Sequence, residues 1–303
     1  ILPHFNSVTN FAGVTKYVEQ INIPGRTTDV MRRAFAGIYQ GRPGPVMVEI
    51  PSDIALEEVP EGEIQWGKSF PNLSSSGNPK DVEAAAHALV TARHPVIHAG
   101  QGVLYADATD ELVELSELLS IPVMTTLLGK SAFPETHSLS LGSGSGVMSG
   151  TLHHFMQRAD MVFGIGCSFT KHGMSMNIPE GKTMIHSSND DRDINKDYNV
   201  DYPIVGDAKL VLRQMIDACR DLVGNGKRGD LSVEQEIVKE RDAWLNEWRE
   251  KLTYSGRPIN PYRVIWDFMH TIPPHDAIVT HDSGSPRDQI VPFYRSEGAR
   301  SYL

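Results

Sequence analysis

The stretch GRPGPVMVEIPSDI, Gly41–Ile54, places a short, mostly apolar run between two groups of chain breakers. The residues before it, Thr27–Gly41, begin with threonines and an aspartate and end in glycine, a pattern typical of a helix. A Pro-Gly-Pro turn follows, and the β-branched run Val46–Ile50 has the length and composition of a strand buried in a sheet. Pro51 ends that strand because proline cannot donate to the ladder. The stretch therefore predicts the closing helix, turn and strand of an α/β unit.

The composition limits the classes of protein that this chain can belong to. Its 303 residues predict about two domains, or three small ones. A net charge of −10 argues against binding to a nucleic-acid backbone, and the apolar runs fall far short of the ~20 residues of a membrane helix. Its two cysteines, Cys167 and Cys219, exclude a disulfide framework and a cysteine-based zinc site. We therefore expect a globular protein of a reducing, cytoplasmic compartment, with neither nucleic acid nor membrane as a partner.

The two ends of the sequence suggest an internal piece of a longer protein. The chain starts at Ile1, and its first residues have neither the basic nor the apolar region of a signal peptide. It stops at SEGARSYL, just as an apolar pair begins. A processed mature chain is the alternative explanation.

Two polar, aperiodic stretches, near residues 57–79 and 224–232, predict the domain boundaries. The predicted division is residues 1–57, a linker at 58–79, a second domain at 80–224 and a third at 233–303. Within the second domain, runs typical of strands alternate with amphipathic helical patterns, which indicates a mostly parallel sheet covered on both faces. The predicted strands are Pro95–Gly100, Ile121–Thr126, Asp160–Gly166, Lys182–Ser188 and Tyr202–Gly206, and the predicted helices are Asp81–Ala92, Ala108–Ser120, Ser149–Ala159 and Asp207–Val223. A further strand, Asp276–Gly284, is predicted to open the third domain.

Four blocks of sequence, in the same order, resemble the thiamine-diphosphate-dependent enzymes of the acetolactate synthase and benzoylformate decarboxylase group. Gly41–Ile54, with Val14–Ile21 before it, resembles the end of their pyrimidine-binding domain, and Ile121–Gly142 is similar to their central domain. The segments ADMVFGIG and VGDAKLVL follow as they do in that domain, and DAIVTHDSG with the later PFY resembles the start of the pyrophosphate-binding domain. The resemblance implies an α/β chain of parallel-sheet units: the end of the first domain, the complete central domain and the start of the third.

The resemblance implies a function for the whole protein. The first expectation is acetolactate synthase-like carboligation or decarboxylation of 2-keto acids. The alternative is an acyl-CoA lyase or decarboxylase of the same family. The family implies thiamine diphosphate and Mg²⁺ as cofactors, a small 2-keto acid or acyl substrate, and a homodimer or homotetramer. Two readings from other classes stay open: a nucleotide-binding or NAD-dependent module without this catalysis, and a non-catalytic scaffold.

The resemblance places no catalytic residue within this chain. The family's activating glutamate lies upstream of Ile1, and its Gly-Asp-Gly metal motif does not occur, since Gly206-Asp207 and Gly229-Asp230 are followed by alanine and leucine. We therefore expect the Mg²⁺ ligands outside the chain and assign no metal ligand to it. The turn HDSGSP is the predicted contact with the cofactor's terminal phosphate, through Asp282, Gly284 and Ser285. A plain strand-to-helix turn is the alternative.

Glycine-rich turns that end strands, and polar residues after one strand, predict a nucleotide site in the central domain. The candidate residues are Gly100, Gly142, Gly144, Gly146, Gly164, Asn189 and Asp190. The family binds FAD there in acetolactate synthases and ADP in oxalyl-CoA decarboxylase. Its Gly-Met-His-Gly sequence is replaced here by Gly144-Ser145-Gly146, however, so a domain without a nucleotide stays open.

The histidines and cysteines predict structural roles. His153 and His154 are adjacent and point to different sides of a helix, so they cannot easily share a metal. His98 and His186 fall in predicted strands, and Cys167 has no readable catalytic partners, which favours a small buried thiol.

Overall fold

The computed structural model describes residues 5–59, 62, 68, 73–224 and 231–303. These residues form two compact units, one ending at Ser74 and the other beginning at Ser75. Much of both predicted boundary stretches, 57–79 and 224–232, lies outside the described residues. The predicted domain limits therefore stay predictions.

The first unit contains the helix–turn–strand that the opening stretch predicts. Strand β1 (Tyr17–Gln20) pairs in parallel with β2 (Val46–Glu49), in a register that sets Tyr17 opposite Val46. Helix α2 (Thr27–Tyr39) connects them and buries Val30 and Ala34. The smaller elements are α1 (Ser7–Phe11), a 3₁₀ turn η1 (Pro24–Arg26) and α3 (Ser52–Ala55).

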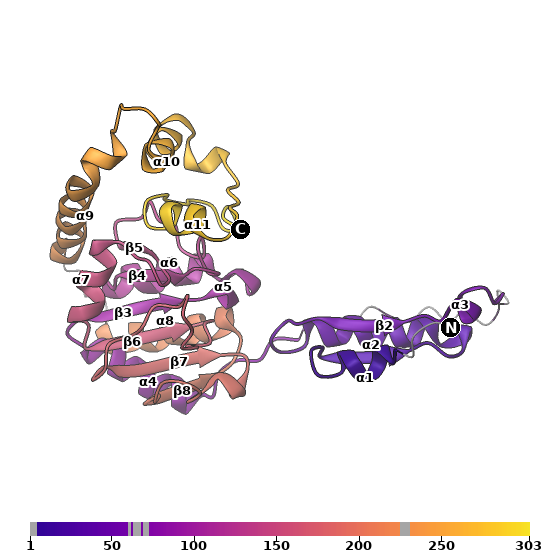
Figure 1. Ribbon diagram of the computed structural model, residues 1–303. Coiled ribbons are helices and arrows are strands. Elements are labelled where there is room, and N and C mark those ends of the chain that lie inside the picture. The colour runs from indigo at the N-terminus through magenta and orange to yellow at the C-terminus, as the bar shows by residue number, and fades with distance from the viewer. Residues whose placement is uncertain (1–4, 60–61, 63–67, 69–72, 225–230) are drawn as a thin grey trace. The chain divides into compact units, whose positions relative to one another are not determined.

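The second unit is built on a six-stranded parallel sheet in the order β5-β4-β3-β6-β7-β8 (Figure 1). The strands are β3 (Pro95–Ala99), β4 (Val123–Thr126), β5 (Ser140–Gly144), β6 (Met161–Ile165), β7 (Thr183–Ser188) and β8 (Tyr202–Val205). The chain first builds outward from β3 to β5 and then restarts at β6 on the other side of β3. This reversal makes the sheet doubly wound, with its topological switch point between β3 and β6.

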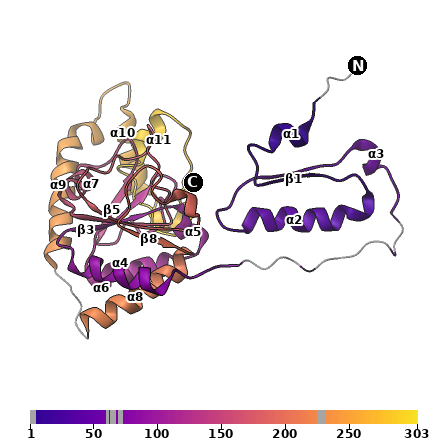
Figure 2. The same ribbon diagram turned by 90° about the horizontal axis from the view of Figure 1, so that it is seen from below.

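Helices cover both faces of this sheet, as the alternating pattern predicts. Helices α4, α6 and α8 lie together on one face, and α7 and α9 lie on the other (Figure 2). Because both faces are covered, the central strands are buried along nearly their whole length. The helices of this unit are α4 (Pro79–Thr91), α5 (Gln101–Tyr105), α6 (Thr109–Leu119), α7 (Gly150–Arg158), α8 (Ala208–Val223), α9 (Leu231–Leu252), α10 (Pro261–Thr271) and α11 (Ser285–Ile290), with 3₁₀ turns η3 (Asp191–Asp193) and η4 (Pro274–Asp276).

Aromatic side chains join α9 to the last part of the chain. Trp244 of α9 stacks on Phe293 at a ring-centroid distance of 4.6 Å, and Trp248, one turn further along, lies 5.4 Å from the same ring. A second cluster joins Val279, Val291, Tyr294 and Tyr302. The last part of the chain, including α11, belongs to the same compact unit as the central sheet.

The α/β class and the parallel sheet predicted from the sequence are confirmed, with three local corrections. The predicted strand Asp276–Gly284 is replaced by η4 and a single parallel bridge between Val279 and Tyr302. The glycine-rich stretch after Leu141 begins within an edge strand, β5, and Gln101–Tyr105 forms a short helix after β3. Glycine and serine conceal β5 because neither residue type carries a strand preference.

None of the helices described in this structure is long and apolar enough to span a membrane.

Candidate functional site

The topological switch point is the place where a doubly wound sheet normally binds its ligand. Here two glycine turns leave the sheet side by side, one after β3 at Gly100 and one after β6 at Gly166. The Gly100 amide donates to the carbonyl of Ile165 at 2.9 Å, and the Gly102 amide donates to the carbonyl of Gly166 at 2.8 Å. The amides of Gly100 and Gly102, which could otherwise donate to a phosphate, are therefore bonded to the neighbouring turn.

The two turns are in such close contact that no side chain fits between them. A Cβ atom at Gly100 would lie 2.3 Å from the Gly166 carbonyl oxygen, and one at Gly102 would lie 2.7 Å from the Gly166 Cα. Gly129 closes the other side, since its Cβ would lie 2.8 Å from the Gly100 carbonyl carbon. Gly100 is thus required because two backbone segments pack against each other. In the sequence alone, such a glycine cannot be distinguished from one that lets a phosphate approach the backbone closely.

Phe169 fills the adjoining part of the crevice. Its ring lies over Gly164, where an added Cβ would come within 2.2 Å of the ring. The ring also contacts His186 and His98, at centroid distances of 4.5 and 5.3 Å. Phe169 is buried and adopts a left-handed φ of 45°, which a phenylalanine accepts only where its surroundings hold it. Gly164 is therefore covered by an aromatic side chain of the same chain.

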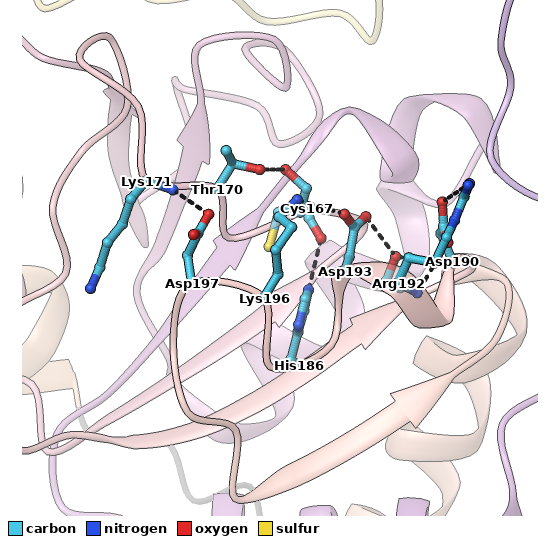
Figure 3. Close-up of polar contacts among 11 residues, drawn as sticks. Cys167, Thr170, Lys171, His186, Asp190, Arg192, Asp193, Lys196 and Asp197 are labelled. Atoms are coloured by element: carbon cyan, nitrogen blue, oxygen red, sulfur yellow. Dashed lines mark hydrogen bonds and ion pairs between the residues drawn. The ribbon is translucent and has the colours of Figure 1, made fainter. Parts of the chain in front are cut away.

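Burial sets the protonation states of the groups beneath Phe169. The buried position of His98, together with the nearby His186, lowers the pKa of His98 to about 4, so the ring is neutral near pH 7. Burial also lowers the pKa of His186, whose Nε2 lies 2.9 Å from the carbonyl oxygen of Cys167 (Figure 3). The Cys167 thiol has its pKa raised to about 12 by burial, which makes it a structural group and not a nucleophile.

The polar residues after β7 are bonded to one another. Asp190 is buried and accepts hydrogen bonds from the Arg192 side chain at 2.8 and 2.7 Å, one on each carboxylate oxygen (Figure 3). Lys196 donates to Asp193 at 2.8 Å in the same loop. A ribose at Asp190 would have to compete with the Arg192 guanidinium, whereas Asn189 is exposed.

The predicted glycines Gly142, Gly144 and Gly146 have different surroundings. A Cβ at Gly144 would meet apolar atoms of Leu152 at 2.8 Å and Met124 at 3.2 Å, and the Gly146 amide donates to the Met174 carbonyl at 3.0 Å. Gly142 has a φ of 80°, and within the described chain its Cβ position faces open space. The predicted nucleotide residues therefore lie at the ends of four strands, β3, β5, β6 and β7, and most of their amides or Cβ positions meet the protein itself.

The predicted diphosphate turn, Asp282–Ser285, is exposed, in contrast to the enclosed glycines of the predicted nucleotide site. Asp282, Gly284 and Ser285 are all exposed, and Gly284 has a φ of 84°. Nothing in the described chain lies within 4 Å of a Cβ built at Gly284, so backbone here is open to a bulky anion. Among the described residues, no group of three or more His, Cys, Asp or Glu side chains could hold a metal ion.

Sequence reasoning missed two features of this unit. Phe169 carries no signal of its own, because a phenylalanine after a strand looks like any core residue. The second is a buried ion pair between Lys130 and Glu135, in the loop between β4 and β5. The signal for it is a lysine and a glutamate within the otherwise apolar and turn-rich stretch LLGKSAFPE.

These features define a doubly wound α/β protein whose switch-point crevice is closed by its own glycine turns and Phe169. Residues 82–215 match the family model for the thiamine pyrophosphate enzyme central domain. The chain is 32% identical to a probable acetolactate synthase large subunit of Methanocaldococcus jannaschii, over 97% of this chain and 50% of that protein. It is 31% identical to the acetolactate synthase isozyme 3 large subunit of Escherichia coli K12, over 90% of this chain and 48% of the relative.

Two further similar proteins are named as a carboligase and a decarboxylase. A glyoxylate carboligase of Escherichia coli O157:H7 is 31% identical over 78% of this chain and 40% of its own length. The crystal structure of benzoylformate decarboxylase from Polynucleobacter necessarius shares the fold, with a TM-score of 0.71 and 20% identity over 95% of this chain and 51% of that one. The chain thus spans about half the length of the curated relatives it matches. Residues 82–215 thus match the thiamine pyrophosphate enzyme central-domain family, and the chain as a whole is similar to acetolactate synthase large subunits.

We expect Gly100→Ala to lower the free energy of unfolding by about 3 kcal/mol or more, because its Cβ would meet backbone that cannot move aside. Gly173→Ala is the matched control, since its Cβ would face open space within the described chain, and we expect a change within about 0.5 kcal/mol. Urea unfolding followed by circular dichroism measures both. A Gly100→Ala protein as stable as the control would contradict the close packing of the two turns.

We expect acid to weaken the fold through His98. Its folded-state pKa of about 4 lies below the ordinary value of 6.5, so the unfolded chain takes up a proton over this window that the folded chain does not. Stability is therefore complete above pH 6.5 and falls by about 3 kcal/mol as the pH drops to 4. Urea unfolding between these pH values should show a shallower dependence for His98→Gln and an unchanged one for His87→Gln, an exposed histidine. The same slope in all three proteins would refute the assignment.

Proposed function

We propose that the polypeptide carrying this chain is a thiamine-diphosphate-dependent carboligase or decarboxylase acting on 2-keto acids, in the manner of acetolactate synthases. The observation that carries this proposal is the match to acetolactate synthase large subunits along 97% of the chain, at 32% identity. An acyl-CoA lyase or decarboxylase of the same family is the second candidate. We further propose a homodimer or homotetramer in the cytoplasm, with Mg²⁺ held by residues outside this chain.

The diphosphate turn fits the cofactor's anionic end. Gly284 leaves its Cβ position open, and its positive φ suits glycine, so the backbone can approach a phosphate closely. Ser285 begins α11 and carries an exposed hydroxyl that can donate a hydrogen bond. Asp282 accepts from the Ser283 amide at 2.7 Å, which fixes the shape of the turn. In this proposal Gly284 and Ser285 bind the terminal phosphate and Asp282 supports them.

Thiamine diphosphate, when bound, supplies the electron sink for chemistry next to a carbonyl group. The proposed role of this chain is to bind and orient the cofactor, because no catalytic residue is assigned to it. Asp207, the aspartate of the Gly206-Asp207 pair, accepts from the Lys209 and Leu210 amides at 3.0 and 3.2 Å. Those bonds make it the N-cap of α8 and support the reading that this pair is not the metal motif.

The switch crevice does not fit a flavin. Phe169 covers Gly164, the turns at Gly100 and Gly166 bond to each other, and Asp190 is engaged by Arg192. No step of the proposed function is therefore assigned to FAD. Binding of ADP by residues such as Gly142 and Asn189, which are less enclosed, is the part of the nucleotide hypothesis that we keep as a proposal.

We expect the whole polypeptide to release carbon dioxide from a 2-keto acid such as pyruvate or glyoxylate only when thiamine diphosphate and Mg²⁺ are both present. The 303-residue chain alone should show no turnover, since the family's activating glutamate and metal motif are not among its residues. Gly284→Ala should raise the cofactor concentration needed for half-maximal rate by about tenfold, because its Cβ occupies the open position at positive φ. Gly298→Ala is the control on the same segment. Turnover by the 303-residue chain, or none by the whole polypeptide with any 2-keto acid, would defeat the proposal.

We expect the purified chain to be colourless, without a flavin absorbance band, because its switch crevice is filled by Phe169 and the glycine turns. Calorimetric titration with FAD should likewise show no binding at micromolar concentrations. Flavin at one equivalent per chain in the purified protein would show that the crevice opens or that the site lies elsewhere.

A further inference from the structure

The loop between β4 and β5 buries a lysine and a glutamate. The Lys130 and Glu135 side chains are 1% and 2% exposed and form an ion pair. Removing two charges from water costs several kilocalories per mole for each ion unless hydrogen bonds replace the lost hydration. The structure must therefore supply partners for both groups, and these partners show what the pair is joined to.

One set of partners comes from the end of the chain, about 160 residues later in sequence. Lys130 Nζ donates to the carbonyl oxygens of Tyr294 at 2.7 Å and Val291 at 3.4 Å. Glu135 Oε2 accepts from Ser296, from its amide at 2.8 Å and from its hydroxyl at 3.1 Å. Each side chain of the pair thus binds backbone of residues 291–296.

The backbone of Glu135 adds two more links to the same segment. Its amide donates to the carbonyl oxygen of Ser296 at 2.8 Å, and its carbonyl oxygen accepts from Arg295 Nε at 2.8 Å. Residues 130–135 and 291–296 are therefore joined through side chains and backbone together.

The other set of partners comes from the central sheet. Ser143 of β5 donates through its hydroxyl to Glu135 Oε1 at 2.6 Å, and the Thr125 hydroxyl of β4 lies 2.6 Å from the Ser143 hydroxyl. The four residues of this network, Thr125, Lys130, Glu135 and Ser143, are all buried. A continuous polar network thus leads from two strands of the sheet, through Glu135 and Lys130, to residues 291–296.

We infer that Lys130 and Glu135 are positioning residues that fix the diphosphate turn Asp282–Ser285 on the central domain. The inference rests on the proposed function for the role of that turn. The connection is short: Gly284 caps the start of α11 and Val291, whose carbonyl Lys130 binds, caps its end. Because α11 is a single hydrogen-bonded segment of six residues, holding its end restricts where its start can lie. Figure 1 shows α11 beside the β4–β5 edge of the sheet.

A charged pair suits this role better than apolar side chains would. A buried ion pair is a weak stabiliser compared with well-packed apolar residues of similar volume. An ammonium group, however, satisfies the carbonyls of Val291 and Tyr294 only when that segment lies in one place. Apolar replacements would fill the space but leave those carbonyls and the Ser296 amide without partners. The pair therefore specifies position more than it adds stability.

The test separates position from stability by amide hydrogen exchange on the 303-residue chain, without cofactor. In Lys130→Met and in Glu135→Gln, each of which leaves one buried charge, we expect lower overall stability and faster exchange of residues 284–296. The decisive variant is Lys130→Met/Glu135→Met, which leaves neither charge unpaired. It should unfold at a urea concentration close to that of the wild type, yet residues 284–296 should exchange at least about tenfold faster, with β3, β6 and β7 unchanged.

Lys182→Met is the matched control. Lys182 also donates to two backbone carbonyls, of Ala159 at 2.6 Å and Gln157 at 3.4 Å, but these lie at the end of α7. It should leave exchange of residues 284–296 at the wild-type rate. Wild-type exchange of this segment in the double variant, or equal acceleration in Lys182→Met, would overturn the inference.

A second measurement reads the consequence for the cofactor in the whole polypeptide. The double variant should need about tenfold more thiamine diphosphate for half-maximal rate, with kcat at saturating cofactor changed less than about twofold. A loss of kcat with unchanged cofactor requirement would contradict a positioning role. Absence of turnover in the wild-type polypeptide would refute the proposed function, whereas the exchange experiment, which needs no cofactor, would still decide whether the pair holds the segment.

Discussion

The contact between the two glycine turns at Gly100 and Gly166 is the constraint on which the central domain depends. Strands β3 and β6 are neighbours at the middle of the sheet, and their turns can leave it together only if neither carries a side chain at the point of contact. The bonds from Gly100 and Gly102 to Ile165 and Gly166 then continue the strand pairing beyond the strands themselves. This continuation holds the two halves of the doubly wound sheet in register.

The same contact changes what the domain can offer to a ligand. Where many sheets of this type leave a crevice, this one has bonded backbone, with Phe169 filling the adjoining space above His98 and His186. The turn Asp282–Ser285 is exposed, in contrast, and the polar network through Lys130 and Glu135 links the segment that follows it to β4 and β5. The central domain thus fills its switch point with its own residues and is joined through the β4–β5 loop to residues 291–296.

Much of this fold was predictable from sequence, because strands such as Asp160–Gly166 are short apolar runs and helices such as Asp207–Val223 have a clear amphipathic period. The site was less predictable. Glycines at 100 and 164 stand where a nucleotide site would have them, but their reason is contact with Gly166 and Phe169, which no local pattern records. The partners of Lys130 lie about 160 residues away, so only the folded chain brings them together.

The two edges of the sheet have a consequence for how copies of the protein meet. An exposed edge strand is a template on which another molecule can add a strand, the first step toward aggregation. At one edge, β8 is four residues long and contains Pro203, which has no N–H to offer. At the other, the pairing of β5 shifts register beside Gly142, so the strand is not a regular ladder. Both borders of the sheet thus discourage edge-to-edge polymerisation while the interior stays regular.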